Sequence, residues 1–222
     1  KLLLLFLGGF IVSANWFTYI YAVNTDHVIE ASMGYYMNPL FVVLLGVTVF
    51  KEKLTRWQII ALVLAATGVI SITVQYGKLP WIASFLATSF AVYGLLKKIV
   101  MVDSVTGLVL ETAIVAPIAL IYIIRLQQSG DGAIGNIPWW TTIILAGAGV
   151  ITATPLLLFA RGLANTTFSM MGFLQYIAPT LSLLLGIFVF KEYFSVYHFI
   201  SFSFIWIALA IFTMANLGLL RE

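Results

Sequence analysis

Residues 36–52 read YMNPLFVVLLGVTVFKE, an apolar run that ends in a Lys-Glu pair. With the residues before it, the run extends from Ala31 to Phe50. A helix needs roughly 20 apolar residues to cross the hydrocarbon core of a bilayer. The apolar residues do not alternate with polar ones, as they would in the strands of a membrane barrel. The stretch therefore predicts a transmembrane α-helix.

The whole chain has the same apolar character. Of its 222 residues, 62% are hydrophobic and 9% are charged, whereas a soluble domain carries about 25% charged residues. Too few polar side chains exist to cover a surface that faces water, so lipid is the expected surrounding. Cysteine is absent, which excludes disulfides, thiolate metal sites and cysteine nucleophiles.

Eight apolar stretches follow one another with short connections, and only the fifth contains a charged residue, Glu111. The first is too long for a signal peptide and lacks a small-residue cleavage site. The predicted spans are Leu2–Val23, Ala31–Phe50, Trp57–Gln75, Leu79–Leu96, Ser104–Ile124, Pro138–Ala160, Phe168–Phe190 and Val196–Leu217.

The Lys and Arg residues between the spans predict the orientation. Eight of them fall on one side of the membrane and three on the other, and the excess marks the cytoplasmic side. The loop after Phe50 and the C-terminus are therefore predicted to be cytoplasmic. The expected location is the cytoplasmic (plasma) membrane, crossed several times.

The segment at 36–52 recurs at 176–192 as YIAPTLSLLLGIFVFKE, with nine of seventeen positions identical and no gap. A matched Pro, Gly and terminal Lys-Glu pair is hard to obtain by chance in apolar helices, so the match indicates internal duplication. The repeat steps over five helices, an odd number, so the two copies must face opposite ways. Inverted repeats are typical of secondary transporters, in which a site near the midplane opens alternately to each side.

Two five-helix units would give ten helices, of which eight are expected in this chain. The predicted fold is an all-α, polytopic membrane protein with inverted five-helix repeats. Residues 1–77 would supply the last three helices of the first repeat, and residues 78–222 the complete second repeat. The two N-terminal helices of the first repeat are expected to be absent from this chain.

Several segments carry a resemblance to a known family. They are NW at 15–16, YIYAVN at 19–24, EASMGYYMNPL at 30–40, YGLLKK at 93–98, ET at 111–112, TPL at 154–156 and GFLQYIAPT at 172–180. Together they resemble the RarD branch of the EamA transporters, within the drug/metabolite transporter superfamily. The resemblance runs over essentially the whole chain. It implies two inverted five-helix repeats that carry small organic metabolites or drugs.

Glu111 is the sharpest functional candidate. An ionised carboxylate in the middle of a span costs about 3 kcal/mol or more unless it faces a cavity or a partner. Lys97, Lys98 and Arg161 are expected in the same leaflet. Glu111 is therefore a proton-coupling or gating group, one half of a structural ion pair with a neighbouring helix, or a protonated bystander.

Other candidates are polar and aromatic residues inside apolar helices. Amides there either line a substrate pathway or tie helices together. The repeat pairs Tyr35 with Gln175 and Tyr36 with Tyr176, so these positions would flank a site on the pseudo-symmetry axis. The candidate substrate pathway is Asn15, Trp16, Tyr35, Asn38, Glu111, Gln175 and Tyr176.

Prolines and glycines mark further positions. A proline inside a span removes a backbone hydrogen bond, and the resulting kink either acts as a hinge or only shapes packing. The candidate hinges are Pro39, Pro117 and Pro179. Gly147 and Gly149, flanked by alanines, suit close contact with another helix.

The chain has no H-E-x-x-H, P-loop or Gly-x-Ser-x-Gly motif, so it is not expected to be an enzyme. No metal, cofactor or nucleic acid is expected. The predicted function is alternating-access transport of small organic metabolites or drugs, driven by an ion gradient. A non-transporting assembly or sensor protein and a channel are the alternatives. The expected partners are a small-molecule substrate and the lipid bilayer, and a homodimer is left open.

Overall fold

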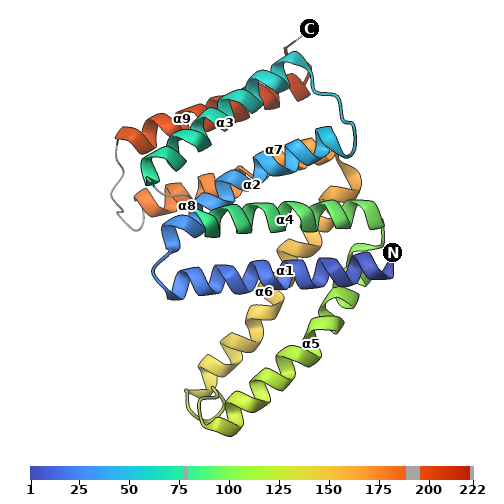
Figure 1. The fold of residues 1–222 in the computed structure, drawn as a ribbon, viewed down its shortest axis with the longest axis vertical. Helices are drawn as coiled ribbons and strands as arrows, with labels where there is room; N and C mark the ends of the chain where they lie inside the picture. The colour runs from blue at the N-terminus through green and yellow to red at the C-terminus, as the bar shows by residue number, and fades with distance from the viewer. Residues whose placement is uncertain (78–79, 189–195, 221–222) are drawn as a thin grey trace. The chain divides into compact units, whose positions relative to one another are not determined.

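The computed structural model describes residues 1–77, 80–188 and 196–220, and helix is the regular secondary structure found in these ranges. Seven helices of the described part are long and apolar enough to cross a membrane. The predicted class, an all-α polytopic membrane protein, is confirmed. In chain order the helices are α1 (Leu2–Asn24), α2 (Val28–Thr48), α3 (Arg56–Tyr76), α4 (Trp81–Val100), α5 (Ser104–Ser129), α6 (Trp139–Asn165), α7 (Phe168–Leu174), α8 (Ile177–Phe188) and α9 (Val196–Asn216) (Figure 1).

Local sequence signals set several helix ends. Thr55 and Gln58 form a reciprocal capping box at the start of α3, which satisfies two backbone donors that the helix leaves open. At the start of α5, the carboxylate of Asp103 accepts hydrogen bonds from the first turn. The residues that follow α3 and α5 are Gly77 and Gly130, whose φ angles of 71° and 89° lie in the left-handed region that glycine adopts without steric cost.

The single helix predicted over 168–190 is interrupted, because α7 ends at Leu174 and α8 begins at Ile177. Pro179 has no N–H to donate to the carbonyl of Gln175, four residues earlier, so the helical ladder lacks a bond at this point. The repeat-related Pro39 lies inside the continuous helix α2, so proline permits this break without forcing it. The last two residues of the predicted span lie outside the described residues, and the count of eight spanning segments stays a prediction.

The described residues pack into two compact units, each discontinuous in sequence. The first unit contains Lys1–Ser13 and Leu96–Asn165, and the second contains Ala14–Leu95 and Thr166–Glu222. α1 and α4 each contribute residues to both units. These units are defined by packing, whereas the predicted division after residue 77 is defined by the internal repeat. The packing does not test the repeat, so the division after residue 77 stays a prediction.

In the second unit, α3 lies along α9 and α2 lies along α7 (Figure 1). A methyl group at Gly68 of α3 would lie 2.7 Å from the carbonyl oxygen of Ser201 in α9, and one at Gly172 of α7 would lie 2.9 Å from that of Pro39 in α2. Glycine is therefore required at both contacts. The buried core of this unit consists of Tyr36, Val43, Ala61, Ala65, Val69, Phe173, Tyr176, Phe202, Ile205, Ala208 and Phe212.

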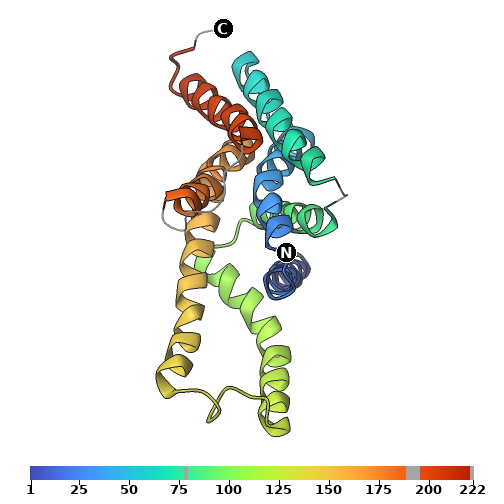
Figure 2. The same ribbon diagram turned by 90° about the vertical axis from the view of Figure 1, so that its left-hand side faces the viewer.

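In the first unit, α5 and α6 form a hairpin that the connection over residues 130–138 closes (Figure 2). The buried residues that the structure describes in these helices are Ser104, Gly107 and Glu111 in α5, and Ala160 and Leu163 in α6. All five lie toward the end away from the connection, and most of the remaining side chains are apolar and exposed. Such a surface is suited to lipid, and the buried residues of the hairpin gather at the end away from the connection.

Gly68→Val is expected to lower the free energy of unfolding by about 1–3 kcal/mol, because the added side chain meets the backbone of α9. Thermal unfolding of the purified protein in detergent measures the change. Gly147→Val is the matched control, because a methyl group at Gly147 or Gly149 has no neighbouring heavy atom within 4 Å. The close helix contact predicted for these two glycines is therefore wrong for the described part of the chain. Equal losses in both variants would contradict the assigned α3–α9 contact.

Candidate functional site

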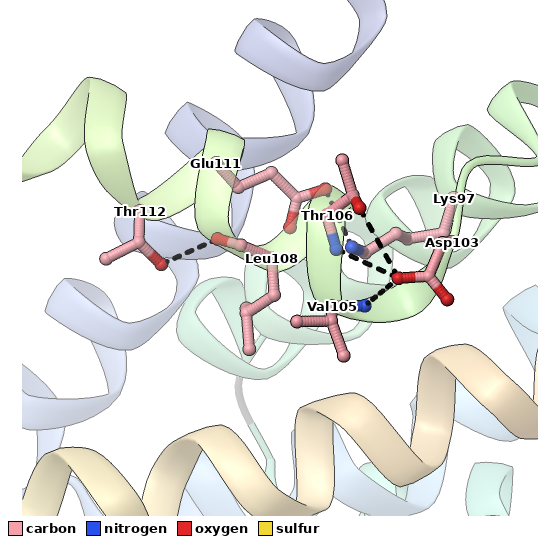
Figure 3. A network of polar contacts seen from close by, with 7 residues as sticks. All are labelled: Lys97, Asp103, Val105, Thr106, Leu108, Glu111 and Thr112. Carbon is pink, nitrogen blue, oxygen red and sulfur yellow. Dashed lines mark hydrogen bonds and ion pairs between the residues drawn. The ribbon is translucent and has the colours of Figure 1, made fainter.

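Glu111 forms a buried ion pair within the first unit. Its Oε1 lies 3.0 Å from Nζ of Lys97, and the two side chains are 3% and 8% exposed (Figure 3). The helix predicted to end at Leu96 continues to Val100, so Lys97 lies in the last turn of α4. Of the cations expected near Glu111, the structure places Lys97 against it, which ties α5 to the preceding helix.

Two glycines give this ion pair its room. Gly107 lies one turn before Glu111, and a methyl group there would lie 3.1 Å from Nζ of Lys97. Gly9 of α1 packs against the backbone of Glu111, where a methyl group would lie 2.9 Å from the carbonyl oxygen. A larger side chain at Gly9 would displace α1, and one at Gly107 would displace Lys97. Glycine at both positions therefore leaves space for the ion pair.

Asn15 and Asn38 both donate to carbonyl groups of α4. The Asn15 side chain donates to the carbonyl oxygen of Leu86 at 2.9 Å and to Oγ of Ser89 at 2.8 Å. The Asn38 side chain donates to the next carbonyl, that of Ala87, at 2.8 Å. These bonds tie α1 and α2 to α4, which is the geometry of interhelical amide contacts. Their place in a substrate pathway stays a prediction.

Three aromatic rings form a continuous edge-to-face series. The ring centroids of Trp16 and Tyr19 lie 6.1 Å apart, and those of Tyr19 and Tyr35 lie 5.8 Å apart. Two predicted pathway residues, Trp16 and Tyr35, are thus joined through Tyr19, which the sequence analysis did not select. Tyr35 is 49% exposed and Trp16 36%, so this series presents an aromatic surface on α1 and α2.

Gln175 and Tyr176 lie at the interruption between α7 and α8. The Tyr176 side chain is 1% exposed. Among the residues that the structure describes, neither its hydroxyl nor the side-chain nitrogen of Gln175 has a hydrogen-bond partner. A buried polar group without a partner costs about 1–3 kcal/mol. The break therefore presents two polar groups whose cost a bound water or ligand would offset.

Tyr36 occupies the position that the repeat relates to Tyr176. Unlike the Tyr176 hydroxyl, the Tyr36 hydroxyl has a hydrogen-bond partner among the described residues. Its hydroxyl donates to the carbonyl oxygen of Pro179 at 2.8 Å, which links α2 to α8. The two related tyrosines thus differ in a testable respect. One hydroxyl supports the interrupted helix, and the other is buried next to the interruption.

Glu52 is a candidate that the sequence analysis missed. Its Oε1 accepts a hydrogen bond from the Phe168 N–H at 2.6 Å, and its Oε2 accepts one from the Ser169 N–H at 2.8 Å. Both donors belong to the first turn of α7, where N–H groups lack helical partners and negative charge is favoured. The signal that points to Glu52 is the Lys-Glu pair that ends both copies of the repeated segment. The second pair lies outside the described residues.

The loop after α2 is shaped to present this carboxylate. Lys51 has a φ of 56°, and the Glu52 N–H donates to the carbonyl oxygen of Gly46 at 3.1 Å. A methyl group at Gly46 would lie 2.8 Å from Oε2 of Glu52 and 2.5 Å from Oγ of Ser169. Glycine at position 46 is therefore what lets the carboxylate reach α7.

The predicted site residues fall in both compact units. Glu111 lies in the first unit, and the other six predicted pathway residues lie in the second. Of the predicted hinges, Pro39 and Pro117 lie inside the continuous helices α2 and α5, whereas Pro179 follows the break. The hinge function of all three prolines stays a prediction.

Comparison with known proteins gives a consistent result. The EamA-like transporter family matches residues 1–74. The chain is 48% identical to an uncharacterized transporter, YojE, of Bacillus subtilis, over 97% of this chain and 72% of the relative. It is 39% identical to the protein RarD of Escherichia coli, over 96% of this chain and 72% of that protein. The resemblance drawn from the sequence is confirmed.

A protein of known crystal structure has a similar fold. It aligns with a TM-score of 0.68 over 98% of this chain and 78% of its own length, at 20% sequence identity. At that identity the similarity concerns the fold alone. It supports the helical arrangement within the described residues and leaves the chemistry of the site to the side chains.

Proposed function

We propose, since the chain belongs to the RarD branch of the EamA-like transporter family, that this membrane transporter is a secondary carrier with an alternating-access cycle. Its proposed substrates are small organic metabolites or drugs, and its proposed location is the cytoplasmic membrane with the C-terminus in the cytoplasm. The names of the compared relatives, uncharacterized transporter and RarD, specify no substrate. The proposal therefore depends on the geometry of the chain.

The interruption of the helix between α7 and α8 is the observation that carries this proposal. Secondary transporters bind their substrates at discontinuous helices near the bilayer midplane. Here the break lies beside two buried polar groups, on Gln175 and Tyr176, that have no partner among the described residues. The proposed substrate contact is this pair, with Trp16, Tyr35, Asn15 and Asn38 completing the pathway.

Packing within the second unit supports the inverted repeat. The duplication relates α3 to α9 and α2 to the α7–α8 pair, and these related helices lie side by side. Two copies around a pseudo-two-fold axis would meet through their equivalent helices in this way. The proposed repeats are residues 1–77, which supply three helices of the first, and residues 78–222, which form the second.

Alternating access also requires contacts that break when the site opens to one side. The bonds from Glu52 to the start of α7 join the first repeat to the second. Loop charges place this contact on the side predicted to be cytoplasmic. In the proposed cycle, it closes the cytoplasmic entrance and opens when substrate passes on that side.

An ion gradient, with protons as the proposed ion, is the driving force in this cycle. Glu111 is the proposed coupling group, because protonation of its carboxylate would remove the charge that holds Lys97. The ion pair would then exist in one half of the cycle and be released in the other.

Tyr176→Phe is expected to reduce substrate flux about tenfold, because one hydrogen bond to a ligand contributes about 1 kcal/mol or more. Stability should not fall, because the hydroxyl that the substitution removes has no partner among the described residues. Tyr36→Phe is the matched control. It removes the bond to Pro179 and should lower the free energy of unfolding by about 0.5–1.5 kcal/mol with a smaller effect on flux. Initial rates in proteoliposomes and thermal unfolding measure the two effects. Unchanged flux in Tyr176→Phe would contradict the proposed substrate contact.

The substrate itself has to be found first. Metabolites that accumulate in cells with and without the protein supply the candidates, which are then tested in proteoliposomes. Saturable flux that follows an imposed proton gradient supports the carrier. Electrical conductance without saturation would indicate a channel, and absence of any flux would favour the assembly or sensor alternative.

A further inference from the structure

A cavity of about 430 Å³ lies in the first unit, where α4 ends, α5 begins and α6 ends. Its polar lining includes Lys97, Lys98, Asp103, Ser104, Arg161 and Asn165. Three different helix ends thus contribute to one hollow, and three of these side chains are cationic. The proposed transport cycle assigns no role to this cavity.

The formal charges of the cavity lining, taken together with Glu111, add up to one positive charge. Lys97, Lys98 and Arg161 contribute three positive charges, and Asp103 contributes one negative charge. Glu111, which is not part of the lining, balances Lys97 through the ion pair at 3.0 Å. A ligand with a single negative charge would complete the balance.

Asp103 remains ionised and is directed to its own helix. Its Oδ2 accepts hydrogen bonds from the N–H groups of Thr106 at 3.1 Å and Val105 at 3.0 Å (Figure 3). These hydrogen bonds hold the pKa of Asp103 below its ordinary value. The carboxylate is therefore engaged at the start of α5, and the cations on α4 and α6 define the character of the cavity.

Position and shape point to an amphiphilic anion. Helix ends lie at the level of lipid headgroups, and the three cations fall on the side predicted to be cytoplasmic. Met101, which also lines the cavity, is 80% exposed, so an apolar surface adjoins the cationic one. Basic pockets between transmembrane helices are known to bind the phosphate groups of anionic lipids.

We infer that this cavity binds a phosphate oxyanion, and that its source is the singly charged phosphodiester headgroup of an anionic lipid. Arg161 presents a guanidinium whose planar donors match phosphate oxygens. Lys98 adds a second charge from α4, where its Nζ donates to the Leu163 carbonyl at 3.1 Å. The lipid would thereby bridge α4 and α6 at their ends.

Native mass spectrometry tests this inference on protein purified from membranes, stripped of lipid and offered equal amounts of phosphatidylglycerol and phosphatidylcholine. The wild-type protein is expected to retain phosphatidylglycerol in preference. Arg161→Gln should weaken that retention about tenfold, because it removes a charge-assisted contact. Arg161 is exposed, so the variant should fold, and Lys98→Gln provides a second variant. Arg125→Gln is the matched control, because Arg125 is also exposed but lies near the other end of α5.

Thermal unfolding with added inorganic phosphate separates the two sources of the anion. In one outcome, phosphate stabilises the wild-type protein as much as phosphatidylglycerol does, and loses this effect in Arg161→Gln. That result would support a phosphate site at the cavity and assign it to a soluble anion. Stabilisation by phosphatidylglycerol alone would support the lipid. Equal retention of both lipids, or equal loss in Arg125→Gln and Arg161→Gln, would overturn the inference. These measurements need no substrate, so their outcome is independent of transport.

Discussion

In a variant that carries Ser169→Cys, a thiol reagent added from the cytoplasmic side can label position 169. Adding Glu52→Gln is expected to increase the rate of this labelling about tenfold or more. The substitution removes the charge that two N–H groups at the start of α7 bind. Hydrogen bonds to a charged group contribute about 1.5–3 kcal/mol each, and 1.4 kcal/mol corresponds to a factor of ten. In the proposed cycle, the cytoplasmic entrance should therefore open more often.

Position 169 is a suitable reporter for this contact. Its side chain is 3% exposed, so labelling requires that α7 separates from the loop after α2. The sequence contains no cysteine, so the introduced thiol gives a signal without background from this chain. Substrate flux should also fall, because the proposed cycle needs the closed state as well as the open one.

Lys51→Gln is the matched control for Glu52→Gln. It removes the neighbouring charge and keeps the loop and both bonds of Glu52 to α7. Labelling of Ser169→Cys should then remain at the wild-type rate. If both substitutions accelerate labelling equally, general loosening of the loop explains the effect, and the assignment of Glu52 to the cytoplasmic entrance is lost.

Glu111→Gln is expected to lower the free energy of unfolding by about 3–5 kcal/mol, because it leaves the buried ammonium of Lys97 without its counter-charge. Lys97→Met should have a loss of the same order, because it removes the positive charge that lies 3.0 Å from the Glu111 carboxylate. The double variant Lys97→Met with Glu111→Gln removes both charges. Replacing a buried ion pair with uncharged groups is often neutral for stability, so the double variant should unfold close to the wild-type temperature.

Flux in the double variant separates the alternatives for Glu111. If Glu111 only forms a structural ion pair, the uncharged residues of the double variant can take its place. Substrate flux would then return to the wild-type level together with stability. A coupling group is not replaced, because an amide cannot take up and release the proton. We expect stability without proton-driven accumulation of substrate. Full accumulation by the double variant would assign Glu111 to structure alone.

The sequence predicted the helices well because hydropathy reports the environment of each segment directly. Where a helix runs past its predicted end, the cause is physical. α5 continues to Ser129 and α6 to Asn165, beyond the predicted Ile124 and Ala160, because a helix does not need apolar residues once it leaves the hydrocarbon. Polar residues such as Gln127 then extend the helix outside the region that hydropathy detects.

The candidate site was only partly predictable. The cost of a buried charge identified Glu111, and the limited set of nearby cations included its partner Lys97. Glu52 could not be placed in the same way, because its partner Phe168 lies 116 residues away and no local pattern connects them. The break after Leu174 was missed because Pro39 and Pro179 have matching surroundings in the sequence but different backbones in the structure.

The length of α6 has a consequence for the choice of membrane. Its 27 residues extend about 40 Å at 1.5 Å per residue, whereas a bilayer core is about 30 Å thick. Its buried residues within the described structure lie near one end, at Ala160 and Leu163, so packing leaves most of its length free to tilt. Hydrophobic mismatch should therefore act on this helix first. The length of the lipid acyl chains should then set the tilt of the α5–α6 hairpin from the bilayer normal.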